Sequence, residues 1–148
     1  MAYEDMARSH VKELAREAFE LEQVVEDADG VLPFPCGTAM VYVSVVGEGR
    51  VVRVWSRVVG DVRVTKALLQ EINDVNAGLV ASRVWATHGE VWIEACMPVE
   101  VLRPCDVGFL LAEVGRTADR LGSMLAAVHG GRVANPEAAE HAWEDEER

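Results

Sequence analysis

The chain has 148 residues, half of them hydrophobic, which fits one folded domain with a sizeable core. Its 25 acidic and 14 basic residues give a net charge of −11, which argues against nucleic-acid binding because a phosphate backbone requires a dominant basic surface. No apolar run approaches the roughly 20 residues of a membrane-spanning helix, so we expect no membrane partner.

Three cysteines lie far apart in the sequence, at Cys36, Cys96 and Cys105, and no CxxC pair occurs. This pattern favours reduced thiols over a disulfide framework or a zinc site. The N-terminal segment Met1–Arg8 carries acids and lacks the apolar stretch of a signal peptide. Together these features predict a cytoplasmic protein that holds no metal and no cofactor.

The N-terminal region predicts one long helix from Tyr3 to about Asp27. Its apolar residues recur at alternating spacings of three and four and share one stripe: Ala7, Val11, Leu14, Ala18, Leu21 and Val25. The stripe is short, which favours packing onto a sheet over a coiled coil. Asp29 and Gly30 then form a turn, and the Pro33–Pro35 segment forces an extended backbone before the sheet.

Two strands are predicted next, over Met40–Val46 and Val51–Val59, with a hairpin loop at Gly47–Gly49. A second helix follows over Lys66–Ala77, and Thr65 suits its N-cap.

The second half of the chain repeats this pattern. Strands are predicted over Ser82–Thr87 and Glu90–Met97, joined by a turn at His88 and Gly89. Val99–Leu102 is a candidate extension of the sheet edge. A third helix begins at Pro104 and ends at about His129, before two glycines.

These elements predict an α+β domain ordered helix–strands–helix–strands–helix, in which helices pack on an antiparallel sheet. The domain is expected to span residues 1–131. Residues 132–148 are rich in acids toward their end, and we expect them to form a disordered tail.

The sequence holds no recognisable catalytic or metal site. Nucleophile and phosphate-loop motifs such as GxSxG, GxGxxG and the Walker loop are absent. Four histidines occur without neighbours at the spacing of a metal-binding helix: His10, His88, His129 and His141. An enzyme would require residues such as Asp61, His88 or Glu90 to converge in a deep pocket.

The alternation of residues along the strands is the most informative pattern. One side collects aliphatic residues: Val41, Val43, Val45, Val52, Val54, Val84, Val91 and Ile93. The other side collects aromatic and charged residues: Tyr42, Arg53, Trp55, Arg57, Arg83, Trp85, Trp92 and Glu94. If no bulge exchanges the faces, helices cover the first side and the second presents Trp, Tyr and Arg, the residues that dominate binding hot spots.

Three interpretations of the aromatic side stay open. It binds an acidic or apolar peptide, it closes a homodimer, or it is a boundary region in which arginine stems cover the rings.

Two further features are unusual for their helices. Asn73 and Asn76 lie inside the second helix, and we interpret them as a clamp on neighbouring backbone, with a ligand contact as the alternative. Gly108, Gly115 and Gly122 recur one heptad apart in the third helix. They predict a close approach to another element, either within the monomer or across a dimer.

The segment Leu68–Asn76, with the sequence LLQEINDVN, resembles the "LLxxLNxLN" helix of the YbjN family. A tryptophan-containing strand, Arg83–Trp85, and an acidic-apolar strand, Glu90–Ala95, follow in the order that this family shows. The likeness covers about residues 3–131. It departs from the family at Arg103, where an acid or serine is expected to cap the last helix, and in the three helix glycines.

The resemblance implies the fold of the type III secretion chaperones. It also implies a small, non-enzymatic protein that binds a peptide segment or a partner protein and is often a homodimer. Binding would proceed by strand addition or in an apolar groove. A dedicated regulatory or structural subunit of a stable complex is the alternative function, and an enzyme with an unrecognised site is the third.

Overall fold

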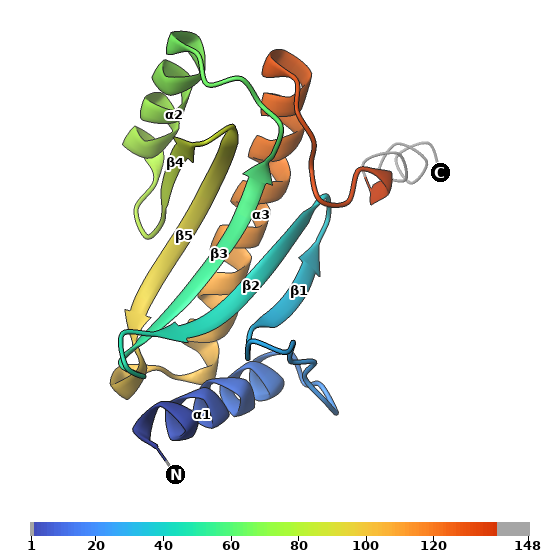
Figure 1. The fold of residues 1–148 in the computed structure, drawn as a ribbon. Helices are drawn as coiled ribbons and strands as arrows, with labels where there is room; N and C mark the ends of the chain where they lie inside the picture. Colours follow the sequence, from blue (N-terminus) through green and yellow to red (C-terminus); the bar gives the residue numbers. More distant parts are fainter. Residues whose placement is uncertain (1, 139–148) are drawn as a thin grey trace.

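The computed structural model describes residues 2–138, which form one α+β domain (Figure 1). Its elements in chain order are α1 (Tyr3–Ala18), β1 (Leu32–Cys36), β2 (Ala39–Val46), β3 (Val51–Val59), α2 (Lys66–Gly78), β4 (Arg83–Thr87), β5 (Glu90–Pro98), a short 3-10 helix (Val99–Val101) and α3 (Pro104–His129). The strands make one antiparallel sheet in the order β1-β2-β3-β5-β4, which confirms the predicted fold class. Within residues 2–138, no helix is long and apolar enough to cross a membrane.

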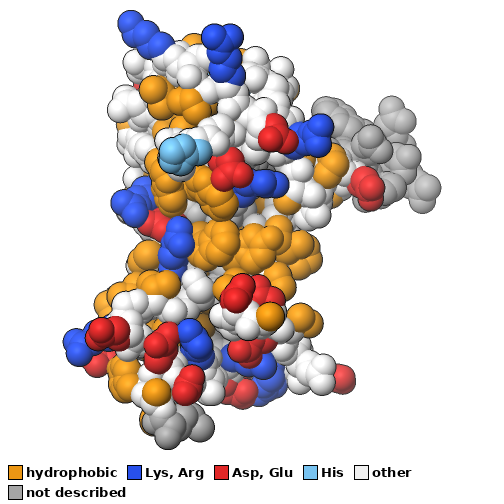
Figure 2. Space-filling view, in the orientation of Figure 1, with side chains coloured by type: hydrophobic (Ala, Val, Ile, Leu, Met, Phe, Trp, Pro, Cys, Tyr) orange, Lys and Arg blue, Asp and Glu red, His pale blue; other side chains and the backbone are white. Residues whose placement is uncertain are grey.

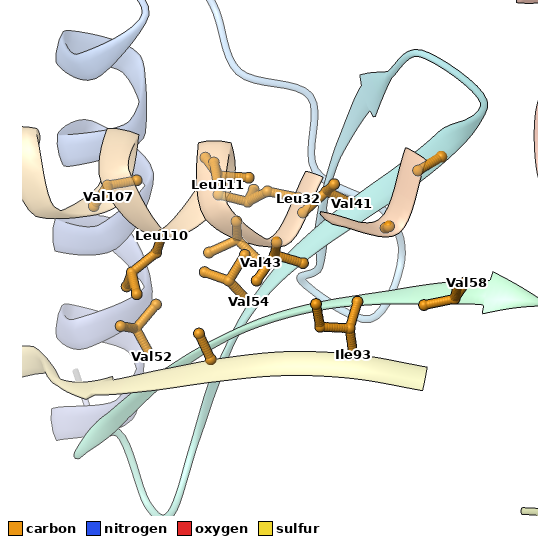
Figure 3. Close-up of a cluster of buried hydrophobic side chains, with 14 of the residues drawn as sticks. Leu32, Val41, Val43, Val52, Val54, Val58, Ile93, Val107, Leu110 and Leu111 are labelled. Carbon is orange, nitrogen blue, oxygen red and sulfur yellow. The ribbon is translucent and has the colours of Figure 1, made fainter. Parts of the chain in front are cut away.

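The aliphatic face of the sheet forms the centre of the core. The strands pair so that Val43 lies opposite Val54 and Val84 opposite Ile93, which places their side chains on one side of the sheet. All eight residues predicted for this side are buried. The long helix α3 lies along it and directs Leu110 toward the valines of the strands (Figure 3).

The first helix is shorter than predicted. It ends at Ala18 instead of about Asp27, because Glu20 adopts a left-handed backbone with φ of 51° and Leu21 N–H donates to the Arg16 carbonyl. Leu21 stays in contact with the core, but the predicted Val25 is 70% exposed. The three-and-four spacing continues by coincidence past the point where the chain leaves the helix.

Two parts of the sheet edge also differ from prediction. The Pro33–Pro35 segment, expected only to be extended, lies within β1, which pairs with β2. Proline is tolerated there because β1 is an edge strand. Val99–Leu102, a candidate extension of the sheet, contains a 3-10 helix at Val99–Val101 instead.

The chain beyond α3 does not leave the domain at residue 132, where a disordered tail was predicted. Arg132 exchanges two backbone hydrogen bonds of 2.8 Å with Gly60, and Asn135 N–H donates to the Thr38 carbonyl at 2.8 Å. These bonds hold residues 132–138 against the ends of β2 and β3. Residues 139–148, the remainder of the predicted tail, lie outside the described part of the chain.

Two of the three helix glycines bring α3 close to the sheet. A Cβ atom on Gly115 would lie 2.8 Å from Cys36 Sγ, and one on Gly122 would lie 2.6 Å from the Val58 carbonyl oxygen. Gly108 has more room, since the nearest atom, Ala18 Cβ, is 4.0 Å away. Close packing within the monomer therefore accounts for the absence of side chains at Gly115 and Gly122.

We expect Gly122→Ala to lower the free energy of unfolding by about 1–3 kcal/mol, because the added methyl group meets a backbone oxygen that cannot rotate away. Gly108→Ala is the matched control, and higher helix propensity should raise stability by up to about 1 kcal/mol. Urea unfolding followed by tryptophan fluorescence measures both values. Equal effects of the two substitutions would contradict the close approach at Gly122.

Candidate functional site

Seven residues on the side of the sheet away from α3 form the candidate site, which we call the Trp/Arg face: Tyr42, Arg53, Trp55, Arg57, Arg83, Trp85 and Trp92. Strand pairing places Tyr42 opposite Trp55 and Trp85 opposite Trp92. A bulge occurs in β3 between Arg57 and Val59, at the end of the strand, so the residues before it keep their side. The residues predicted to share a face are therefore contiguous in the folded protein.

The aromatic rings form a row across β2, β3 and β5. Tyr42 stacks on Trp55 with ring centroids 4.6 Å apart, and Trp55 meets Trp92 at 5.8 Å in a tilted arrangement. The Trp55 indole N–H also donates to Ser44 Oγ at 3.3 Å. Each ring of this row is partly exposed. Because the rings hold one another in place, a ligand packing on them would cost little side-chain entropy.

The arginines of the face lie over or beside these rings. The guanidinium of Arg53 is 5.2 Å from the Trp55 centroid, and that of Arg83 is 5.2 Å from the Trp85 centroid. Arg57 contacts Glu90 at 3.4 Å across β3 and β5. The side chains of Arg57 and Arg83 are 44% and 74% exposed, so both present hydrogen-bond donors to the solvent.

Glu94 supplies a buried negative charge beneath the arginines. It is only 6% exposed and accepts hydrogen bonds from Arg53 and from Arg83, the latter at 2.8 Å through Nε. Burial raises the pKa of Glu94, but the hydrogen bonds and charges of Arg83 and Arg53 outweigh burial and bring its pKa below the usual value. The carboxylate thus fixes two arginine heads at the surface and neutralises part of their charge.

Figure 2 shows this side of the molecule in the orientation of Figure 1, with α3 behind the sheet. An apolar band crosses the middle of the face, and charged side chains of both signs lie above and below it. An apolar strip bordered by charges suits contact with another polypeptide.

A second candidate is an apolar pocket of about 360 Å³ between the end of α1, strand β1 and α3. It is lined by Phe19, Leu21, Phe34, Pro35, Cys36, Val41, Leu111 and Ala112. Burial raises the pKa of the Cys36 thiol in this wall. The pocket was not predicted because Phe19–Asp27 was interpreted as helix and β1 was not recognised. These two segments bring the ring centroids of Phe19 and Phe34 to 5.6 Å from each other.

The two predicted clamp residues have different surroundings. Asn76 holds edge strand β4 through both of its amide atoms: Nδ2 donates to the Val84 carbonyl at 2.8 Å, and the Val84 N–H donates to Oδ1 at 2.9 Å. Asn73 is exposed, and among the described residues no side-chain hydrogen bond ties it to β4. Both residues lie in α2 as predicted, but only Asn76 faces the sheet.

The titratable residues considered for catalysis are dispersed or paired. His129, at the end of α3, contacts Glu71 of α2, whereas His10 and His88 are exposed. Asp61 lies 3.8 Å from Arg132 on an exposed surface. His141 lies outside the described residues. Within residues 2–138, no cluster of three or more His, Cys, Asp or Glu side chains is arranged to hold a metal ion.

We expect Glu94→Gln to lower the free energy of unfolding by about 1–2 kcal/mol at neutral pH, a reduced figure because Arg83 is largely exposed. A carboxylate whose pKa is depressed by folding stabilises the protein above its unfolded pKa, and this stabilisation is lost as the pH falls through the folded value. The difference between the two proteins should therefore shrink as the pH falls below the ordinary glutamate pKa of 4.5. Urea titrations at several pH values measure it, with Glu100→Gln as an exposed control, and a constant difference would contradict the charge pairing.

Comparisons with known proteins place this geometry in a family. The family model TY-Chap1, described as "T3SS (YopN, CesT) and YbjN peptide-binding chaperone 1", matches residues 5–137. No curated protein matches in sequence.

Solved structures show the same fold. A chain in the crystal structure of the ExsC–ExsE complex is 17% identical, with a TM-score of 0.63 over 79% of this chain and 94% of its own length. A chain in the complex of the Yersinia pestis type III secretion chaperone SycH with a fragment of YscM2 is 13% identical, with a TM-score of 0.59 over 78% and 98%. YbjN from E. coli is 8% identical, with a TM-score of 0.63 over 82% and 92%.

At these identities the structural likenesses establish the fold alone. The family model, in contrast, covers most of the sequence and includes both the helix that carries the resemblance and the Trp/Arg face. The protein therefore belongs to the family of T3SS and YbjN peptide-binding chaperones.

Proposed function

We propose that this protein binds an extended segment of a partner protein on its Trp/Arg face, as a chaperone-like or regulatory module without catalytic activity. The observation that carries the proposal is the row of partly exposed rings Tyr42, Trp55 and Trp92, bordered by arginines, on the side of the sheet opposite α3. Membership of a family of peptide-binding chaperones supports a polypeptide as the ligand.

The chemistry of the face suggests the composition of the bound segment. Apolar side chains of the segment would pack on the rings, and carboxylates would pair with the exposed donors of Arg57 and Arg83. Three arginines, Arg53, Arg57 and Arg83, are paired with two carboxylates, Glu90 and Glu94, so the face keeps one net positive charge on a protein whose net charge is −11. This local positive charge favours acidic residues in the bound segment.

Two structural relatives support a protein or peptide client. One was solved as the complex of ExsC with ExsE, and the other as the chaperone SycH in complex with a stable fragment of YscM2. We propose the same type of partnership for the present chain. The sequence identities to these relatives, 17% and 13%, establish a shared fold and not a shared partner.

We also propose that binding takes place in the cytoplasm. The three cysteines are free thiols in the structure, and Cys96 and Cys105 are exposed, which suits a reducing compartment.

A homodimer is the competing use of the same surface. The family resemblance implies a homodimer, and a partly apolar sheet face is one surface that a second copy would cover. A dimer that used the face would occlude it from a client.

We expect Trp55→Ala combined with Trp92→Ala to weaken peptide binding by about tenfold or more, because the central rings of an interface carry most of its affinity. An array of short random-sequence peptides selects a binder of the wild-type protein, and fluorescence anisotropy of that peptide with a fluorescein label measures the affinity. Phe109→Ala is the matched control, since Phe109 is 57% exposed on α3, outside the face.

Circular dichroism would verify that the double variant is folded. An affinity equal to that of the wild type would contradict the proposal. A wild-type dimer that the double variant converts to a monomer, as seen by sedimentation velocity, would instead assign the face to self-association.

A further inference from the structure

The sheet has two edges at which a bound peptide could add a strand, β1 and β4. Strand addition requires backbone N–H and C=O groups that point outward from the edge and have no partner. In an antiparallel sheet, alternate residues of an edge strand direct these groups outward, so the pairing register identifies which residues are available.

Strand β1 presents no outward donors. Pro33 lies opposite Tyr42 and Pro35 opposite Met40, and neither proline has an N–H with which to form a hydrogen-bonded pair. The amides that can face β2 are therefore those of Leu32, Phe34 and Cys36. The outward positions are the two prolines, which offer carbonyl oxygens alone, and an added strand would find no donor along this edge.

Strand β4 is closed by a side chain. The outward N–H and C=O of Val84 are both bound by Asn76 of α2, at 2.9 Å and 2.8 Å. By alternation, Ala86 is the other residue of β4 whose backbone faces outward. One free residue is too short an edge for a stable added strand.

The two edges indicate the same pattern of backbone hydrogen bonds across the sheet. If the prolines face outward, Tyr42 forms a hydrogen-bonded pair with Trp55, and Glu94 forms one with Arg83. That sequence of pairs leaves Val84 facing outward, which is where Asn76 binds it. The prolines of β1 and the Asn76 clamp on β4 thus support the same hydrogen-bonding pattern, one from each edge of the sheet.

We propose that the client segment is bound through its side chains, lying across the Trp/Arg face, and does not join the sheet as a sixth strand. This inference rests on the proposed function and specifies how the segment is held. The occupant is an extended segment with apolar side chains that contact Trp55 and Trp92, and with a carboxylate within reach of Arg57 or Arg83.

N-methylation of the peptide backbone tests the binding mode. The array-selected peptide is prepared in two versions, methylated at odd or at even positions, so that strand addition in either register loses its donors in one version. We expect both versions to keep an affinity within about threefold of the parent, whereas lost main-chain pairing would cost about tenfold or more in one of them.

The reactivity of the three native cysteines tests where the peptide binds. Cys96 lies on the open side of the sheet opposite Arg53, Cys36 lines the apolar pocket, and Cys105 is exposed at the start of α3. Alkylation by iodoacetamide, followed by peptide mass spectrometry, gives a rate for each thiol in the intact protein. The bound peptide should slow alkylation of Cys96 severalfold and leave Cys36 and Cys105 at their original rates.

The outcomes separate the two proposals. A large loss of affinity in one methylated version would overturn the side-chain mode while leaving peptide binding on the Trp/Arg face intact. Protection of Cys36 in place of Cys96 would locate the peptide in the apolar pocket and would overturn both this inference and the face named in the proposed function. If no peptide of the array binds the wild-type protein, the proposed function fails, and this inference fails with it.

Discussion

The close approach of α3 to the sheet is the constraint on which the rest of the structure depends. Gly115 and Gly122 let the helix lie against β1, β2 and the end of β3, where a methyl group would collide with Cys36 or with the Val58 carbonyl. At that distance the valines of the strands pack directly on the apolar stripe of the helix. Asp119 of the same helix accepts hydrogen bonds from the Thr38 N–H and hydroxyl, both at 2.7 Å, and so holds the β1–β2 turn.

This arrangement decides what the other side of the sheet can do. Helix α3 buries the aliphatic side, and no described helix covers the opposite side (Figure 1). The residues on that opposite side must therefore be stable at the surface. Cation–π contacts and the buried carboxylate of Glu94 provide that stability for Arg53 and Arg83. The same contacts hold the guanidinium groups of Arg53 and Arg83 in fixed positions and partly cover the rings of Trp55 and Trp85.

Much of the fold could be predicted from the sequence, because simple periods governed it. The period-two alternation of β2, β3, β4 and β5 correctly divided the aliphatic from the aromatic residues. The proline of the first turn and the two glycines after His129 gave the limits of α3. The composition of the Trp/Arg face followed from this division. The ion pairs of Glu94 did not, because they depend on the pairing of strands that are distant in the sequence.

The errors arose where a local pattern has two physical explanations. Proline usually excludes a strand, but at an outer edge it removes a donor that the sheet does not need, so β1 was missed. The stripe of α1 continued through Leu21, although a left-handed residue at Glu20 had already ended the helix. Asn73 and Asn76 are three positions apart in α2, and only the structure shows that one of them faces solvent. Residues 132–138 have no strong pattern, and their place is determined by backbone bonds to Gly60 and Thr38.

The clamp that Asn76 forms on Val84 has a consequence for the behaviour of the protein in a crowded cell. Unfolded or partly folded polypeptides tend to aggregate by pairing their backbones with any exposed strand edge. Any folded protein with a free strand edge is exposed to such pairing. With one edge rich in proline and the other occupied by an amide side chain, this sheet cannot act as a template for such aggregation.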